Sequence, residues 1–188
     1  MSEVPDPLAL ELLDGGQAAG HEPELRALRA EVCGEAAVRP DRDVREFRPR
    51  FPVQFRQPGF VLAEARHGGY LVGYAAGWPL RPSAAWWRHL TTPLPEEVTA
   101  EHPGRTFALT DLLVRASWRR QGIGADLHQL ILAGRPEERA TLTVAPAATA
   151  AQRAVRSWGW DKIARTRGPG QETPVRDVFL ITLPAGRC

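Results

Sequence analysis

The sequence has 188 residues and a mass of 20.7 kDa, and 43% of its residues are hydrophobic, which is enough to bury one substantial core. Its formal net charge is only +2, which argues against a nucleic-acid-binding protein. No run of about eighteen uncharged apolar residues is present, and the acidic N-terminus lacks the basic-then-apolar order of a secretion signal. These features predict a cytoplasmic protein that does not bind a membrane.

The cysteines and the basic side chains indicate which metal sites and which anion-binding groups to expect. Cys33 and Cys188 lie far apart, without the spacing of a disulfide framework or a zinc site, so we expect no metal and a reducing compartment. Lys162 is the only lysine, and the other basic side chains, histidines apart, are arginines. Any bound anion would therefore be met by planar, bidentate guanidinium groups.

The N-terminal quarter of the chain predicts one helix and one ambiguous segment. Residues 1–8 contain two prolines and few apolar side chains, so we expect a flexible tail. Apolar residues recur at helical spacing over 23–38, which predicts the first long helix. The arginine-rich segment 41–58 is compatible with a helix interrupted by Pro49 and Pro52 or with an ordered loop, and the sequence does not distinguish the two.

A β-hairpin follows. The apolar runs 60–65 and 70–78 are separated by a short turn that contains Gly68 and Gly69, which predicts an antiparallel pair of strands. Residues 79–105 then form a long, proline-rich connection with room for one short helix.

Large aromatic side chains mark the end of this hairpin and the connection after it. Trp78, Trp86 and Trp87 could cap the hydrophobic core or form the wall of a substrate pocket, and both interpretations stay open.

The remainder of the chain alternates strands and helices. In chain order, the pattern predicts a strand over 106–114, a helix ending at Gly134, a strand over 140–146, a short helix ending at Gly159, and strands over 160–166 and 175–183. No internal repeat is present. We therefore expect a single domain over 1–188 in which a sheet is flanked by helices.

The most informative segment is the junction between the strand 106–114 and the helix after it. This helix opens with Gly122-Ile123-Gly124, and the unpaired N–H groups of a first helical turn form a binding site for anions such as phosphate. Neither common nucleotide motif is present: there is no GxxxxGK[ST], and Leu127 occupies the third glycine position of GxGxxG. The anion site at Gly122 is therefore neither a P-loop nor a dinucleotide-binding loop.

Arg119-Arg120-Gln121-Gly122-Ile123-Gly124 resembles the signature [RQ]-x-x-G-x-[GA] of the GCN5-related N-acetyltransferases, the GNAT superfamily. The helix that ends with Gly159 and Trp160 also resembles a second segment of the same family, a helix that ends in a glycine and an aromatic residue. The resemblance implies the GNAT acyl-CoA N-acyltransferase fold, an α/β (α+β mixed) fold. Its central mixed, mostly antiparallel six- or seven-stranded sheet has splayed central strands and is flanked by helices.

The resemblance also implies which residues bind acetyl-CoA or another acyl-CoA as the co-substrate. The strand end would bond the pantetheine arm through its main chain, and the loop and first helical turn would hold the pyrophosphate. The implied cofactor-binding residues are Leu112, Leu113, Val114, Arg119, Arg120, Gln121, Gly122, Ile123, Gly124 and Ala125.

Two carboxylates are candidates for the catalytic base that deprotonates the acceptor amine. Asp111 lies within the motif strand, where aspartate is disfavoured and where many relatives carry a glutamate, and Glu64 on the strand 60–65 is the second candidate. An ion pair with one of the many arginines is the competing interpretation for Asp111, and a solvated or salt-bridged strand residue is the competing interpretation for Glu64. The family's usual tyrosine acid and an asparagine are replaced by Val155 and Ala148, so the general acid is not identified.

The sequence thus predicts an acetyl-CoA-dependent N-acetyltransferase whose acceptor, a small-molecule or peptide amine, attacks the thioester directly. Two alternatives remain: a non-catalytic acyl-CoA-binding or sensor domain, and an acyltransferase whose donor is an acyl-carrier protein. The carboxy-terminal strands offer an edge for a homodimer, and neither nucleic acid nor a membrane is an expected partner.

Overall fold

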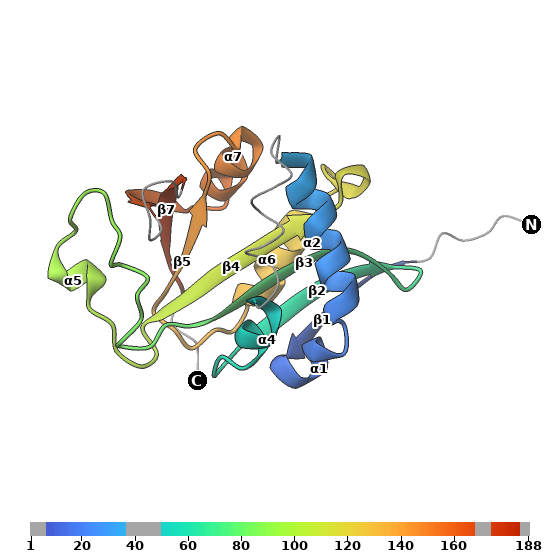
Figure 1. Ribbon diagram of the computed structural model, residues 1–188, viewed down its shortest axis with the longest axis horizontal. Helices are drawn as coiled ribbons and strands as arrows, with labels where there is room; N and C mark the ends of the chain where they lie inside the picture. Colours follow the sequence, from blue (N-terminus) through green and yellow to red (C-terminus); the bar gives the residue numbers. More distant parts are fainter. Residues whose placement is uncertain (1–6, 37–49, 168–173, 185–188) are drawn as a thin grey trace, which may run out of the picture. The chain divides into compact units, whose positions relative to one another are not determined.

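The computed structural model describes residues 7–36, 50–167 and 174–184 (Figure 1). Its strands form a seven-stranded sheet with the order β1-β2-β3-β4-β5-β7-β6. β4 and β5 run parallel, whereas β1–β2, β2–β3, β5–β7 and β6–β7 are antiparallel. The predicted mixed, mostly antiparallel sheet is therefore confirmed.

The strands are β1 (Leu8–Asp14), β2 (Val61–His67), β3 (Tyr70–Pro79), β4 (Thr106–Val114), β5 (Arg139–Val144), β6 (Asp161–Arg167) and β7 (Val175–Thr182). The helices are α1 (Gly15–Ala19), α2 (Glu22–Ala36), α4 (Arg50–Phe55), α5 (Glu96–Thr99), α6 (Ile123–Leu132), α7 (Thr149–Ser157) and the 3₁₀ helix η1 (Ala116–Trp118).

The chain divides into two compact units. The N-terminal unit comprises residues 1–78 and 111–133, and the C-terminal unit comprises residues 79–110 and 134–188. β4 contributes to both units, because its first five residues belong to the C-terminal unit and Asp111–Val114 belong to the N-terminal unit. All residues that the sequence assigns to the candidate site lie in the N-terminal unit.

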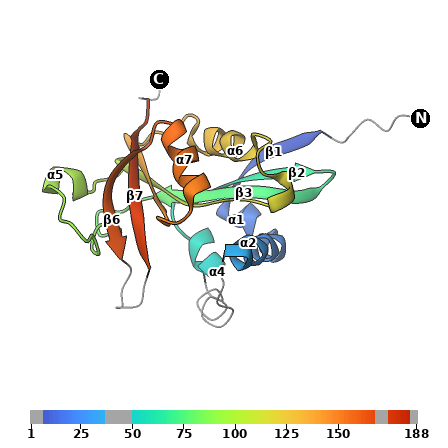
Figure 2. The same ribbon diagram turned by 90° about the horizontal axis from the view of Figure 1, so that it is seen from above.

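The N-terminal unit is built on the predicted hairpin of β2 and β3. Gly68 and Gly69 form its two-residue turn, and both have positive φ, which glycine adopts without steric cost. α2 and α4 cover one face of these strands, and α6 covers the other (Figure 2). Leu25 and Leu28 of α2 belong to the core cluster on the α2 face, whose other buried members include Leu13, Phe51, Phe60, Leu62, Leu71 and Tyr74.

The C-terminal unit contains the antiparallel β5, β7 and β6. Residues 89–91 of the long connection pair with β6, through an isolated bridge between Leu90 and Thr166 and a hydrogen bond from Thr91 N–H to the Arg165 carbonyl (2.8 Å). This pairing covers part of an edge that the sequence offered for a homodimer. Homodimerisation itself stays a prediction.

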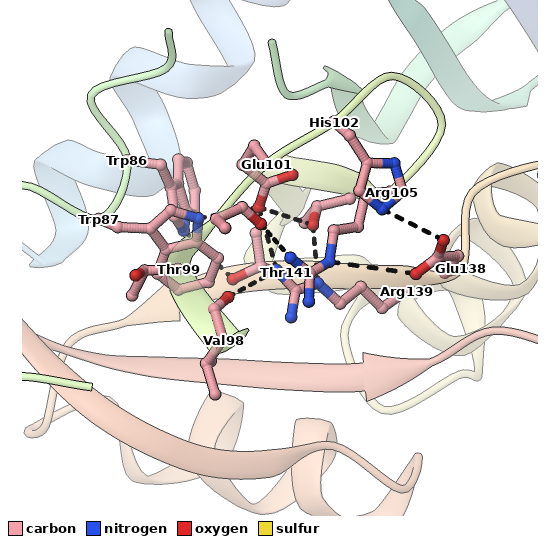
Figure 3. Close-up of polar contacts among 12 residues, drawn as sticks. Trp86, Trp87, Val98, Thr99, Glu101, His102, Arg105, Glu138, Arg139 and Thr141 are labelled. Carbon is pink, nitrogen blue, oxygen red and sulfur yellow. Dashed lines mark hydrogen bonds and ion pairs between the residues drawn. The ribbon is translucent and has the colours of Figure 1, made fainter. Parts of the chain in front are cut away.

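A buried ion pair holds the end of the long connection in the C-terminal unit (Figure 3). The Glu101 side chain is 2% exposed, and its Oε1 accepts hydrogen bonds from Trp87 Nε1 (2.9 Å), Thr106 Oγ1 (2.8 Å) and Arg139 Nη2 (3.1 Å). Burial, together with the neighbouring positive charge of Arg105, lowers the pKa of Arg139. Trp87 therefore belongs to the core, one of the two interpretations that the sequence left open.

Most predicted elements are confirmed to within a few residues, and the strand 106–114 has the predicted bounds. The segment 41–58 contains a helix, α4, at its described end, while residues 37–49 lie outside the described residues. Leu8, which was expected in the tail, is the first residue of β1, and residues 1–6 of that tail lie outside the described residues. Neither β1 nor α1 was predicted.

Candidate active site

The connection from β4 to α6 begins at Arg115, which is buried and whose guanidinium group makes several contacts. Its Nε donates to the Leu71 carbonyl (2.8 Å), its guanidinium pairs with Glu31 of α2, and its Cζ lies 4.5 Å from the centre of the Tyr70 ring. The main-chain N–H of Arg115 also donates to the Val72 carbonyl (2.9 Å). The start of the loop is therefore anchored to β3 and to α2.

The loop ends at Gly122, the N-cap of α6. Gly122 is exposed and has a φ of 88°, which a residue with a Cβ adopts only at a cost. The N–H groups of Ile123, Gly124 and Ala125 have no hydrogen-bond partner among the described residues, and the first bonded amide is Asp126 N–H, which donates to the Gly122 carbonyl (3.0 Å). Three donors at the positive end of the helix dipole are thus free for an anion.

Three long polar side chains precede this first turn. Arg119 Nε donates to the Val114 carbonyl (3.0 Å) and Gln121 Nε2 donates to the Ser117 carbonyl (3.2 Å), while Arg120 is exposed. Asp126 is an acidic residue in the same first turn. The two arginines supply the positive charge that an anion needs beside this carboxylate.

The strand end Leu112–Val114 lies next to β3 at close range. A Cβ built on Gly73 would be 2.9 Å from the Leu113 carbonyl oxygen, so only glycine fits there without a shift. The parallel register of β4 with β5 covers Thr106–Ala108 and ends before Leu112.

Asp111 is buried and paired with Arg29 of α2. Its side chain is 4% exposed, its Oδ1 accepts a hydrogen bond from Arg29 Nη1, and its Oδ2 has no hydrogen-bond partner among the described residues. Burial alone would lower the pKa of Arg29, but the Asp111 carboxylate raises it above its ordinary value. The competing interpretation of Asp111, an ion pair with an arginine, is therefore realised in the structure, and the second carboxylate oxygen is buried without a hydrogen-bond partner among the described residues.

Glu64, the second candidate, is more completely engaged. Its side chain is 2% exposed, Oε1 accepts from Arg66 Nε (2.7 Å), and Oε2 lies 3.0 Å from His21 Nδ1. Glu64 faces Tyr74 in the β2–β3 register, and burial, followed by the Asp111 charge, raises the pKa of Tyr74. Tyr74 thus lies between the two candidate carboxylates on the α2 face and stays a neutral phenol.

Sequence reasoning missed the residues that hold this face together. Arg29 pairs with Asp111, Arg66 donates to Glu24 on α2 (2.7 Å), and Arg115 pairs with Glu31 on α2. Three guanidinium–carboxylate pairs therefore tie α2 to β2, to β4 and to the start of the connection between β4 and α6. The available signal was the spacing of Glu24 and Glu31 by seven residues, which places both on one side of a helix.

No group of three or more histidine, cysteine or acidic side chains that could hold a metal ion is found in the described part of the chain. Within the same ranges, no helix has both the length and the apolar character needed to cross a bilayer.

Comparison with known proteins identifies the family to which this geometry belongs. The model of the acetyltransferase (GNAT) family matches residues 24–160, which is most of the chain. The chain therefore belongs to the GNAT acetyltransferase family. A search of curated proteins gave no match.

Solved structures with the same fold are distant in sequence. Aminoglycoside 6'-acetyltransferase type Ii is 14% identical with a TM-score of 0.64, covering 94% of this chain and 97% of its own. The ribosomal-protein-S18-alanine N-acetyltransferase from Escherichia coli is 13% identical with a TM-score of 0.60, covering 97% and 96%. The PaiA N-acetyltransferase from Thermoplasma acidophilum, solved in complex with coenzyme A, is 8% identical with a TM-score of 0.61, covering 94% and 99%. These likenesses establish the GNAT fold.

Proposed function

We propose that this protein transfers the acetyl group of acetyl-CoA to a primary amine. The observation that carries the proposal is the anion site at the start of α6, where three main-chain N–H groups are free and Gly122 leaves the backbone open. These donors suit the diphosphate of coenzyme A, because phosphate oxygens accept main-chain hydrogen bonds at a helix N-terminus. The main chain of Leu112–Val114 would bind the pantetheine amides.

The reaction needs a neutral amine to attack the thioester carbon. A carbon–nitrogen bond forms, the carbon–sulfur bond breaks, and the amine proton passes to a base, which returns it through water to the departing thiolate. Asp111 is the proposed base, since its buried Oδ2 has no hydrogen-bond partner among the described residues while both oxygens of Glu64 already have partners. Val155 has no acidic group that could protonate the thiolate. The thiolate is still a tolerable leaving group, because a thiol has a pKa of about 8.5.

One observation favours the alternative of a non-catalytic acyl-CoA-binding domain. The Asp111 carboxylate is paired with Arg29, as a structural aspartate would be. The third candidate, an acyl-carrier-protein donor, would use the same strand end for its phosphopantetheine arm.

Release of free thiol from acetyl-CoA, measured with a panel of small-molecule and peptide amines, tests the proposal. An N-acetyltransferase gives amine-dependent thiol release at rates well above those of a heat-denatured sample. Tight acetyl-CoA binding without thiol release for any amine would favour the sensor domain. Consumption of a carrier-bound acetyl group, with acetyl-CoA left intact, would favour the carrier-protein donor.

A further inference from the structure

The strand β1 forms one edge of the sheet (Figure 2). All seven of its residues pair in register with β2 on one side, and no strand of the described ranges pairs with its other side. The main-chain N–H and C=O groups on that other side are therefore open to a further strand. Such an edge is a template on which a strand from another chain can be added.

The side chains of β1 are apolar on one face of the sheet. Leu13 belongs to the buried core on the α2 face, so the alternate residues Leu8, Leu10 and Leu12 (the leucine row) lie on the opposite face. Leu10 and Leu12 are 40% and 45% exposed, and they are two of the four exposed large hydrophobic side chains among the described residues. An apolar row beside an open strand edge is a combination that soluble proteins normally avoid.

The opposite edge of the sheet, β6, is protected against strand addition. It carries the charged side chains of Asp161, Lys162, Arg165 and Arg167, and residues 89–91 pair with part of it. β1 contains no lysine, arginine or proline, and its register with β2 has no bulge. β1 therefore lacks the features that keep an edge strand unpaired.

The segments outside the described ranges do not contain a row that matches β1. These segments are 1–6, 37–49, 168–173 and 185–188, and none of them has three apolar residues at alternate positions. A strand that covers the leucine row needs such a pattern, because side chains on one face of a sheet pack against their neighbours on the next strand. β1 of a second copy has it.

Two copies of β1 match one another as an antiparallel pair about a two-fold axis at Leu10. Leu10 then faces its own copy and Leu8 faces Leu12, so the two leucine rows form one apolar ladder. A shift by one residue would instead set the leucine row against Ala9 and Glu11, because neighbouring residues of a strand point to opposite faces.

The charges of β1 and β2 favour the same register. About Leu10, Glu11 of each copy faces Ala9 of the other. In the β1–β2 register Glu11 is paired with Glu64, whereas Ala9 is paired with Arg66. Each row across the four strands therefore contains two carboxylates followed by an alanine and a guanidinium. An axis at Glu11 would bring four carboxylates into one row, which like-charge repulsion disfavours.

We propose that β1 pairs with β1 of a second copy, antiparallel about Leu10, and that the protein is a dimer built through this edge. The inference is independent of the proposed function, since none of the candidate site residues lies on β1.

Sedimentation equilibrium on the full chain tests the dimer. The wild type should have twice the chain mass of 20.7 kDa. Leu10→Lys places two ammonium groups face to face on the axis, so it should raise the dissociation constant by at least about tenfold. Val53→Lys is the matched control, because Val53 is an exposed large hydrophobic side chain (56%) on α4, and it should leave the dissociation constant unchanged.

Oxidative cross-linking tests the register independently. Leu10→Cys places a thiol opposite its own copy, within the Cα separation that a disulfide spans, and should give a covalent dimer. Leu12→Cys, whose partner in this register is Leu8, should not. The wild type is the control for cross-links through its native Cys33 and Cys188.

These measurements can overturn the proposal separately. A wild-type monomer at the highest soluble concentration would exclude the dimer. A dimer that is as tight in folded Leu10→Lys as in the wild type would place the interface elsewhere. Should circular dichroism show that Leu10→Lys is unfolded, the cysteine variants decide: no cross-link in Leu10→Cys, or equal cross-linking of both variants, would exclude the pairing about Leu10.

Discussion

At the scale of single residues, the Asp111–Arg29 pair decides between catalysis and structure. Removing one partner of a buried ion pair leaves the other charge without compensation, whereas replacing both partners by apolar side chains removes that penalty. Stability and turnover can therefore be separated at this position.

We predict that Asp111→Asn lowers turnover strongly, leaves coenzyme A affinity nearly unchanged, and lowers the free energy of unfolding by about 3–5 kcal/mol. The double variant Asp111→Leu, Arg29→Met should recover most of the stability but none of the turnover. Urea denaturation and steady-state kinetics on the three proteins measure both effects. Recovery of turnover together with stability would show that Asp111 has only a structural role.

The sequence identified Asp111 but not its partner. Aspartate within an apolar strand is unusual, so the residue was recognisable from its own segment. Arg29 lies 82 positions earlier on a helix, in a chain whose basic residues are nearly all arginines, and no local pattern selects it. Glu64 likewise acquires His21 as a partner across 43 positions.

At the scale of secondary-structure elements, the packing of β3 against the end of β4 positions the candidate site. Gly73→Ala would place a Cβ 2.9 Å from the Leu113 carbonyl oxygen and 3.2 Å from Leu127 Cδ1 of α6. We predict a loss of about 1–3 kcal/mol in the free energy of unfolding, with weaker coenzyme A binding because Leu113 must move. Gly69→Ala, at a turn glycine with open space around it, is the control for stability loss alone. Unchanged coenzyme A affinity in Gly73→Ala would contradict a role for this strand end.

The helix α6 also makes stability depend on pH. Burial lowers the pKa of His128 below its ordinary value of 6.5. The unfolded chain therefore binds a proton at a higher pH than the folded protein does, so stability falls as the pH drops below 6.5 and levels off below the folded pKa. The carboxylates with a lowered pKa, Glu24 and Asp177, have ordinary values of 4.5 and 3.8 and titrate below this window.

We predict that His128→Gln removes the loss of stability that sets in as the pH falls below 6.5, the ordinary pKa of histidine. Urea denaturation across this range measures it. If the stability of His128→Gln falls with pH as steeply as that of the wild type, a group other than His128 causes the loss.

Elements with strong local signals were predictable, and those shaped by tertiary packing were not. The Gly68-Gly69 turn and the apolar run 106–114 specify their structures locally. The side chains of β1 are mostly exposed and do not alternate between buried and exposed, so its sequence does not indicate a strand. β1 is a strand because it pairs with β2. Pro52 is the third residue of α4, within the first turn, where the missing N–H has no helical partner to lose.

At the scale of the whole molecule, β4 runs without a break through both compact units. We propose that the chain unfolds as one cooperative domain, since each unit contains part of the same strand. Urea unfolding followed by far-ultraviolet circular dichroism and by tryptophan fluorescence should give one coincident transition. Two separate midpoints would contradict the single domain.

The proposed acetyl-CoA-dependent activity requires the main-chain anion site at Gly122, and one calorimetric comparison tests that site. Gly122→Ala and Gly134→Ala each place a Cβ at an exposed glycine with positive φ and no atom closer than 4.0 Å, so both should cost similar stability. Only Gly122→Ala puts that Cβ beside the free N–H groups. We predict saturable coenzyme A binding by the wild type and by Gly134→Ala, with an affinity at least about tenfold weaker in Gly122→Ala. Equal affinities in all three proteins, or no binding by the wild type at millimolar coenzyme A, would contradict coenzyme A binding at this site.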